Sequence, residues 1–142
     1  MTERSGSAVW EGGIKDGKGQ ISTQSGALSG QPYGFNTRFE DEPGTNPEEL
    51  VGAAHAACFS MALSKELGEA GVTDPRIETK ATVTLEQQGG GFAVTKSHLD
   101  LKLTAKGAER YAVEAAAQTA KANCPISKLL DAEVTMEATY DV

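Results

Sequence analysis

Apolar and polar residues alternate most clearly in three segments of the second half of the chain. Residues 77–86 and 132–140 place mostly apolar side chains at every second position, with charged or hydroxyl side chains between them, and residues 92–104 do so at Leu99, Leu101 and Leu103. Because successive side chains of a strand point to opposite faces, each segment predicts a half-buried β-strand. Three glycines within residues 87–91 predict the turn that joins the first two of these strands.

A long helix is predicted to precede these strands. Asn46 is a typical N-cap, Pro47 suits the first helical position, and Glu49 stands where the acidic residue of a capping box belongs. The helix is expected to end within residues 68–71, where glycine can adopt the left-handed closing conformation. Residues 52–58 are small on nearly every face of this helix, which predicts that it is central and buried.

A second helix is predicted over residues 107–123, which are rich in alanine. Cys124 and Pro125 break it, and Pro125 can open a short helical turn that runs through Leu130.

The Gly-rich first third of the chain gives weaker signals. Residues 8–10 and 20–22 are predicted to be short strands joined by a turn, and residues 33–39 a third extended segment, followed by a polar loop over 40–45. The order of strands, helix, hairpin, helix and strand predicts a single α+β domain over residues 1–142. In such a domain, helices cover one face of a mostly antiparallel sheet.

Charge and hydropathy exclude several functional classes. The 142 residues include 13 Lys and Arg against 20 Asp and Glu, a formal net charge of −7. This balance argues against nucleic-acid binding and against a polybasic membrane-surface protein. The longest nearly apolar run, residues 51–63, is shorter than the roughly 20 residues that a membrane span needs. The first residues lack the apolar core of a secretory signal, so we expect a soluble, cytoplasmic protein.

The two cysteines, Cys58 and Cys124, carry the first candidate chemistry. A buried, inert core cysteine is the commonest state of such residues, and a redox-active pair that closes a disulfide is the alternative. His55 lies one helical turn before Cys58, so a Cys–His nucleophile for acyl hydrolysis is also conceivable. No nearby residue would orient the imidazole, which favours a hydrogen-bonded core histidine.

Other polar residues give weaker indications. Arg38 has the pattern of a solvated surface charge, and Glu48 is explained as a first-turn carboxylate that complements the helix dipole. His98 is expected to be exposed on a strand. The spacings typical of zinc sites do not occur, and no nucleotide-binding glycine motif follows a strand. The sequence therefore predicts neither a metal nor a cofactor.

Four stretches of the chain together resemble one protein family. They are FNTRF at 35–39, GTNPEEL at 44–50, GAAHAACFSMAL at 52–63 and NCPISK at 123–128. These motifs are similar to those of the osmotically inducible protein C (OsmC) family, more than to the related organic hydroperoxide resistance (Ohr) proteins. The order of the predicted elements agrees with that family over nearly the whole chain.

The resemblance implies an α+β OsmC-like fold, with mostly antiparallel sheets packed around central buried helices in an intertwined homodimer. It also implies a thiol-dependent peroxidase that reduces organic hydroperoxides, and more weakly hydrogen peroxide, to alcohols in oxidative or osmotic stress defence. Carried over to this chain, Cys58 is the peroxidatic cysteine and Cys124 resolves it in an intrachain disulfide. Arg38 is the active-site arginine and Glu48 its partner carboxylate. No cofactor is implied, and the reductant is an external dithiol of the lipoyl or another small type.

Physical chemistry adds to that expectation. A free thiol with a pKa of about 8.5 is mostly protonated at neutral pH, and apolar burial raises its pKa further. Cys58 also lies too far from the start of its predicted helix for the dipole to help, so a cation must stabilise the thiolate. Arg38 is the candidate because a guanidinium stays charged.

The positions of Glu48 and Cys58 predict how the protein assembles. Ten residues of one helix separate them, or about 15 Å along its axis. If both serve one site, that site must be shared between two chains.

Apolar candidates for the lining of the site, Phe39, Phe59 and Met61, predict a preference for organic hydroperoxides. A non-enzymatic structural or ligand-binding dimer, with both cysteines as packing residues, remains the alternative from a different functional class.

Overall fold

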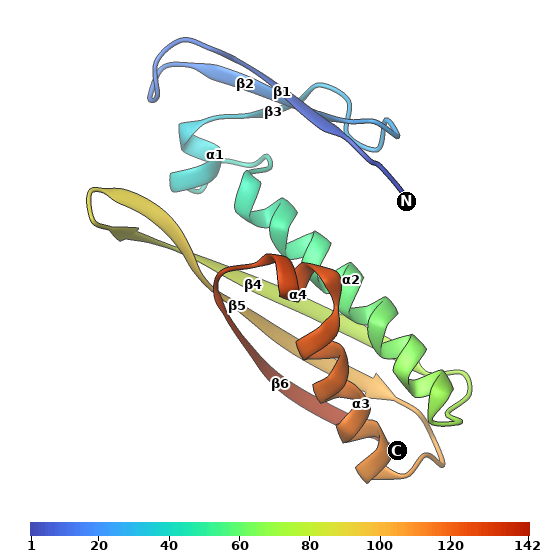
Figure 1. Ribbon diagram of the computed structural model, residues 1–142. Helices are drawn as coiled ribbons and strands as arrows, with labels where there is room; N and C mark the ends of the chain where they lie inside the picture. Colours follow the sequence, from blue (N-terminus) through green and yellow to red (C-terminus); the bar gives the residue numbers. More distant parts are fainter. The chain divides into compact units, whose positions relative to one another are not determined.

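The computed structural model describes all residues, 1–142, as two compact units. The N-terminal unit comprises Met1–Leu50 and the C-terminal unit Val51–Val142. Along the chain the elements are β1 (Gly6–Glu11), β2 (Lys18–Thr23), β3 (Gln31–Tyr33), α1 (Phe35–Phe39), α2 (Pro47–Glu69), β4 (Arg76–Gln88), β5 (Gly91–Thr104), α3 (Arg110–Asn123), α4 (Pro125–Leu129) and β6 (Glu133–Asp141) (Figure 1).

The N-terminal unit is built on an antiparallel sheet of strand order β1-β2-β3. Trp10 of β1 is paired with Gly19 of β2, and Gly19 is paired in turn with Tyr33 of β3. The rings of Trp10 and Tyr33 meet across this glycine, with centroids 5.5 Å apart. A Cβ at Gly19 would collide with both rings, so only glycine allows them to pack together.

The prediction of an extended segment over residues 33–39 is wrong beyond Tyr33, because Phe35–Phe39 forms the short helix α1. The hydroxyl of Thr37 accepts a hydrogen bond from the backbone N–H of Gly34 at 2.9 Å and donates to its carbonyl at 3.0 Å. The rings of Phe35 and Phe39, four residues apart, contact each other at a tilt of 45°, with centroids 5.0 Å apart. The same alternation of aromatic and polar residues therefore serves a helical turn, in which positions i and i+4 are neighbours.

The predicted N-cap, first-turn proline and closing glycine of α2 are confirmed, whereas the Glu49 carboxylate accepts a hydrogen bond from the Thr45 hydroxyl at 2.9 Å. The Asn46 Oδ1 accepts a hydrogen bond from the backbone N–H of Glu49 at 2.8 Å, and Pro47 is the first helical residue. At the other end Gly71 has φ +81°. The backbone N–H groups of Gly71 and Val72 donate to carbonyl oxygens in the last turn of α2, those of Gly68 and Leu67, as in a glycine C-cap.

The sheet of the C-terminal unit has strand order β4-β5-β6. β4 and β5 form an antiparallel hairpin whose turn uses Gly89 and Gly90 at positive φ, as predicted. β6 joins the other side of β5 in parallel, so the sheet is mixed. A parallel neighbour requires a crossover, and α3 and α4 provide it. The α+β class is confirmed.

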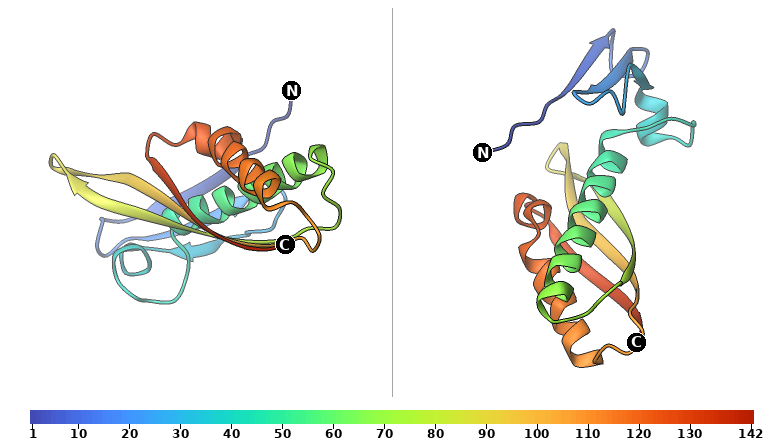
Figure 2. Two further views of the ribbon diagram at one scale, coloured as in Figure 1. Left: turned by 90° about the horizontal axis from the view of Figure 1, so that it is seen from below. Right: turned by 90° about the vertical axis from the view of Figure 1, so that its right-hand side faces the viewer.

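Helices α2 and α3 lie on one face of this sheet (Figures 1 and 2). The core between the helices and the sheet contains Phe59, Leu63, Leu67, Leu99, Leu101, Leu103, Val113, Ala116, Ala117, Ala120 and Cys124. At Gly52 the α2 backbone approaches β4 so closely that a Cβ would lie 3.0 Å from the carbonyl oxygen of Ala81. This close approach explains why residue 52 is a glycine.

The prediction that α2 is central and buried holds for only one side of the helix within one chain. One side, with Gly52, His55 and Phe59, is buried. The opposite side is exposed and consists mainly of small or apolar residues, namely Ala53, Ala54, Ala57 and Met61. Met61 is 77% exposed. This side, the exposed α2 stripe, gives the helix a second apolar face besides the one in the core.

The remaining boundaries differ little from those predicted. α3 begins at Arg110, three residues later than expected, because Gly107 has φ +83° and belongs to the preceding turn. Cys124 ends α3 and is also the N-cap of α4, as the Cys-Pro pair predicts.

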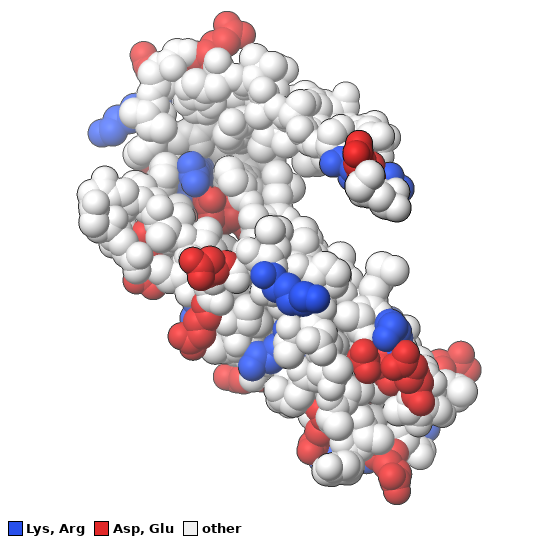
Figure 3. Space-filling view, in the orientation of Figure 1, with Lys and Arg blue, Asp and Glu red and all other residues white.

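The charged side chains and the hydrophobicity of the helices can be compared with the predictions made from composition. Acidic and basic side chains are interspersed on the face shown in Figure 3, separated by wide uncharged areas. None of the helices combines the length and the hydrophobicity needed to cross a membrane.

Candidate active site

Arg38 and Glu48 form a two-pronged ion pair within the N-terminal unit. The Nε of Arg38 donates to Oε1 of Glu48 at 2.8 Å, and Nη2 donates to Oε2 at 3.0 Å. The Glu48 side chain is only 15% exposed. This planar arrangement fixes the orientation of the guanidinium and leaves its Nη1 hydrogens for another acceptor. The predicted partnership of these two residues is therefore present in a single chain.

Asn46 fixes the position of this pair. Its Oδ1 caps α2, and its Nδ2 donates to the carbonyl oxygen of Thr37 at 3.0 Å. Thr37 precedes Arg38 in α1, and Glu48 lies in the first turn of α2. One side chain therefore links the short helix that carries the cation to the start of the helix that carries the carboxylate.

An aromatic pocket adjoins the guanidinium. It has a volume of about 260 Å³ and is lined by Trp10, Ile14, Tyr33, Gly34, Phe35, Arg38 and Phe39. The guanidinium carbon of Arg38 lies 5.3 Å from the centroid of the Phe39 ring. A charged group at the wall of an apolar pocket suits a ligand with an apolar body and a polar end.

The two cysteines meet in the C-terminal unit although 66 residues separate them. Both are free thiols, Cys124 is fully buried, and Cys58 is half-buried against the same core. The pKa of Cys58 is raised, first by burial and then by the charge and hydrogen bond of the neighbouring Cys124 thiol. The backbone N–H of Ile126 acts in the opposite direction, because it hydrogen-bonds the thiolate.

Cys124 is further held by Ser127. The Sγ of Cys124 lies 3.0 Å from the Ser127 hydroxyl, and the backbone N–H of Ser127 donates to the same sulfur at 3.4 Å. Both contacts arise because Pro125 starts α4 directly after Cys124. Cys124 is therefore the N-cap of α4, and Ser127 in the first turn lies over its side chain.

His55 is the hydrogen-bonded core histidine that its position predicts. It is fully buried, and Nδ1 lies 2.7 Å from the Ser97 hydroxyl while Nε2 lies 2.8 Å from the Ser127 hydroxyl. Burial lowers the pKa of its imidazole below the ordinary value. Both ring nitrogens are thus engaged by serines, and the direct Cys58–His55 pair of the acyl-hydrolysis alternative is not formed.

The predicted site residues therefore occur as two pairs. Arg38 and Glu48 belong to the N-terminal unit, and Cys58 and Cys124 to the C-terminal unit. α2 is one continuous helix that carries Glu48 in its first turn and Cys58 ten residues later. Among the proposed lining residues, Phe59 is a correction, because it is fully buried in the core and cannot face a ligand.

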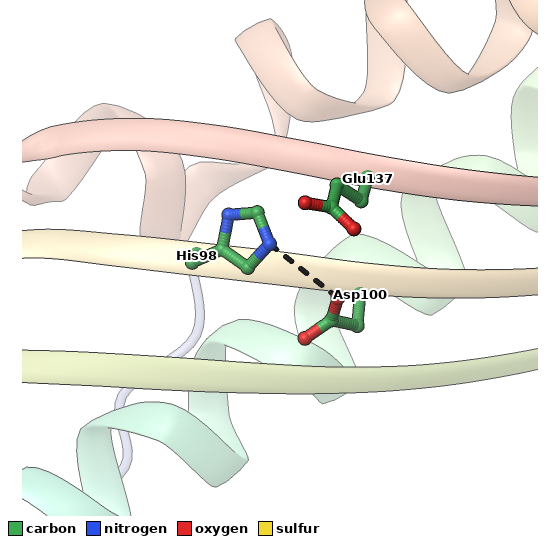
Figure 4. Close-up of side chains that lie close together, drawn as sticks. All are labelled: His98, Asp100 and Glu137. Carbon is green, nitrogen blue, oxygen red and sulfur yellow. Dashed lines mark ion pairs between the residues drawn. The ribbon is translucent and has the colours of Figure 1, made fainter.

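His98 is half-buried rather than exposed as predicted, because its Nδ1 lies 2.6 Å from the Thr135 hydroxyl on β6. Its Nε2 is 3.4 Å from Oδ1 of Asp100, and one oxygen of Glu137 completes a group of three donors within 4.8 Å of one another (Figure 4). Asp100 and Glu137 are exposed, and Lys80 stands opposite Asp100 in the strand register. A cation there would compete with the lysine and with water, so we assign this cluster no role.

Sequence reasoning missed two sets of residues. The aromatic pocket draws on β1, β3 and α1, and only the fold brings these segments together. Ser97 and Ser127 contact His55 from positions 42 and 72 residues away in the chain. Ser127 belongs to the NCPISK motif, and that membership is the one signal that could have singled it out.

Comparison with known proteins gives a consistent result. The family model described as OsmC-like protein matches residues 39–139. The chain is 56% identical over 134 residues to peroxiredoxin OsmC of Escherichia coli K12, with 94% of each chain covered. It is 32% identical to the organic hydroperoxide resistance protein OhrB of Bacillus subtilis, over 78% of this chain and 79% of that one. The crystal structure of OhrB superposes with a TM-score of 0.70 at 25% identity, covering 95% of this chain and 98% of that chain. Both the sequence and the fold therefore show that this chain belongs to the OsmC family.

Proposed function

We propose that this protein is a thiol-dependent peroxidase that reduces organic hydroperoxides to alcohols. The observation that carries this proposal is the contact between the Cys58 and Cys124 thiols, which both pack in or against the apolar core. The names of the E. coli and B. subtilis relatives, a peroxiredoxin and an organic hydroperoxide resistance protein, support the same chemistry. We further propose that both units act together as one OsmC-like domain.

The reaction starts at the more accessible thiol. The thiolate of Cys58 attacks the terminal oxygen of the hydroperoxide, the O–O bond breaks, and the alkoxide leaves as an alcohol after taking a proton. Cys58 is then a sulfenic acid. Cys124 condenses with it, forming the S–S bond and releasing water, which protects Cys58 from further oxidation. An external dithiol, of the lipoyl or another small type, reduces the disulfide by exchange.

Arg38 would supply the positive charge that this chemistry needs. Burial and Cys124 raise the pKa of Cys58, so its thiolate is scarce at neutral pH unless a cation stabilises it. The Nη1 hydrogens of Arg38 can contact both the thiolate and the peroxide, while Glu48 holds the other side of the guanidinium.

The geometry of α2 supports a site shared between two chains. Glu48 and Cys58 lie about 15 Å apart along the helix axis, beyond the reach of a glutamate side chain. A partner related by a two-fold axis beside α2 could bring its own Glu48 and Arg38 to this Cys58. The exposed α2 stripe has the small side chains that close helix packing requires. We therefore propose an obligate homodimer with two equivalent composite sites.

The aromatic pocket beside Arg38 supports the preference for organic substrates. Its seven lining residues offer mostly rings and aliphatic carbon, with one cation at the wall. The organic group of a hydroperoxide would bury apolar surface there, whereas hydrogen peroxide has none to bury.

A thiol titration tests the proposal against its alternatives. One equivalent of cumene hydroperoxide should remove both thiols of each reduced chain and yield the alcohol. If both cysteines only pack the core, both thiols remain titratable, and the peroxidase proposal fails. Covalent capture of an activated ester without loss of peroxide would instead indicate acyl hydrolysis.

A further inference from the structure

A continuous chain of hydrogen bonds connects the thiol of Cys124 to a buried histidine. The thiol lies 3.0 Å from Ser127 Oγ, which lies 2.8 Å from Nε2 of His55. The Nδ1 of His55 lies 2.7 Å from Ser97 Oγ. Cys124, His55 and Ser97 are fully buried, and only Ser127 is half-buried.

We propose that His55 is a positioning residue that receives the proton of Cys124 through Ser127 when Cys124 forms the disulfide. The proposal rests on the assignment of Cys124 as the resolving thiol. Ser97 would fix the tautomer, because Nδ1–H donating to its hydroxyl leaves Nε2 as the acceptor that faces Ser127.

The proton and electron balance of the step is closed. The thiol proton of Cys124 moves to Ser127 Oγ while the proton of Ser127 moves to Nε2. The sulfur of Cys124 attacks the sulfenic sulfur of Cys58 and is oxidised, and the sulfenic sulfur is reduced as its S–O bond breaks. The hydroxide that leaves takes a proton back along the same route and becomes water. Ser97, at the other end of this series of hydrogen bonds, is fully buried. His55 can therefore return its proton only through Ser127.

The surroundings of His55 suit a neutral base. Ser97 faces it from β5, Ser127 faces it from α4, and Cys58 and Cys124 are the titratable groups in the adjoining core. β4, β6 and α3 contribute mainly apolar side chains to that core, with the phenol of Tyr140 towards the far end of β6. Burial alone lowers the pKa of His55, so the imidazole is neutral and able to accept a proton at neutral pH.

The resolving step can be measured without a peroxide. Ellman's reagent attacks the more accessible Cys58 first, releasing one thionitrobenzoate and leaving a mixed disulfide. Attack by Cys124 on the Cys58 sulfur then closes the protein disulfide and releases a second thionitrobenzoate and a proton. The rate of the second release reports the nucleophilicity of Cys124, and the first release reports the intact environment of Cys58.

The variants separate proton transfer from packing. Ser127→Ala should slow the second release about 100-fold, the usual scale of general-base assistance. Ser127→Thr keeps the hydroxyl and should restore a rate close to that of the wild type. His55→Gln keeps hydrogen-bonding groups but cannot take up a proton, so it should also be slow. Its rate should rise with pH from about 7 to 9, whereas that of the wild type stays level.

The matched control is Ser60→Ala. Ser60 lies on α2, as His55 does, and its hydroxyl is 2.7 Å from the hydroxyl of Thr79, away from the cysteines. Both releases of thionitrobenzoate should therefore keep the wild-type rates. The proposal is overturned if Ser127→Ala and His55→Gln show the second release at the Ser60→Ala rate. A single release in the wild type would overturn it too, because Cys124 then does not attack Cys58. Failure of the peroxidase assignment alone would leave both releases intact while cumene hydroperoxide is not consumed.

Discussion

The side chain of Asn46 donates from Nδ2 to the carbonyl oxygen of Thr37 at 3.0 Å, which joins the loop before α2 to the helix that carries Arg38. The same amide caps α2 through its Oδ1. The cap stabilises the helix on which Glu48 lies, and the bridge sets where Arg38 meets it. The two functions use different atoms of one side chain, so they can be separated by substitution.

Replacing Asn46 tests that separation. Asn46→Asp keeps an oxygen for the cap but loses the donor to Thr37, whereas Asn46→Ala loses both. We expect Asn46→Ala to lower the free energy of unfolding by about 1 kcal/mol and Asn46→Asp to lower it less. Both should reduce kcat/KM for cumene hydroperoxide, because Arg38 is no longer held against Glu48. Urea denaturation and steady-state kinetics measure the two effects. Wild-type kcat/KM in Asn46→Asp would show that the bridge is dispensable.

The two cysteines should fail in different ways. Cys58→Ser should abolish hydroperoxide consumption, because a serine hydroxyl is not ionised at neutral pH. Cys124→Ser should still form a sulfenic acid at Cys58, which dimedone traps and mass spectrometry detects. It should then stall or proceed to the sulfinic acid, since nothing condenses with it. Unchanged turnover in Cys58→Ser would contradict the assignment.

Mixing inactive proteins tests whether the site is shared. Cys58→Ser and Glu48→Ala proteins should each be inactive as homodimers. After subunit exchange, each heterodimer would combine an intact Cys58 from one chain with an intact Glu48 from the other. One of its two sites would then be complete, and activity should return in proportion to the heterodimer fraction found by native mass spectrometry. Verified exchange without activity would show that each site is built within one chain.

Substrate preference should depend on the aromatic pocket. Trp10→Ala removes a large part of its lining, so KM for cumene hydroperoxide should rise while the rate with hydrogen peroxide changes little. Val9→Ala is the matched control, because Val9 is the neighbouring residue on β1 and is exposed outside the pocket. Equal effects of Trp10→Ala on both peroxides would indicate that the organic group binds elsewhere.

Burial of neutral His55 should also make stability depend on pH. The pKa of His55 in the folded state lies below the ordinary 6.5, so the unfolded chain binds more protons as pH falls through that value. The contribution is complete above about pH 6.5 and is lost as the pH falls towards the folded-state pKa. The free energy of unfolding should therefore decrease more steeply between about pH 7 and 5 in the wild type than in His55→Gln. Parallel denaturation curves for the two proteins would contradict this prediction.

Local patterns predicted much of the fold correctly. The alternation that buries Leu99, Leu101 and Leu103 depends only on the two-residue period of a strand. The boundaries of α2 depend on a cap and a glycine, which act within a few residues. Phe35–Phe39 was predicted wrongly because five residues are too few to distinguish the two periods, and the bond between Thr37 and Gly34 favours the helix.

The predicted site residues were found by motif, and their surroundings were not. Arg38 and Glu48 pair as expected, while Trp10 and Tyr33 reach the same region through strand pairing across Gly19. Ser97 was missed because nothing in its strand distinguishes it from other inward positions. Contacts between residues far apart in the chain depend on register and crossover, and local sequence specifies neither.

The parallel pairing of β6 with β5 also affects the order of events during synthesis. β6 is synthesised some thirty residues after β5 and pairs with it along its whole length. Cys58 of α2 leaves the ribosome long before β6, the strand that completes the sheet against which α2 packs. A nascent chain therefore passes through a stage in which its first thiol is neither enclosed nor paired with Cys124. Under the proposed mechanism, a Cys58 that is oxidised at that stage has no neighbouring thiol to condense with it.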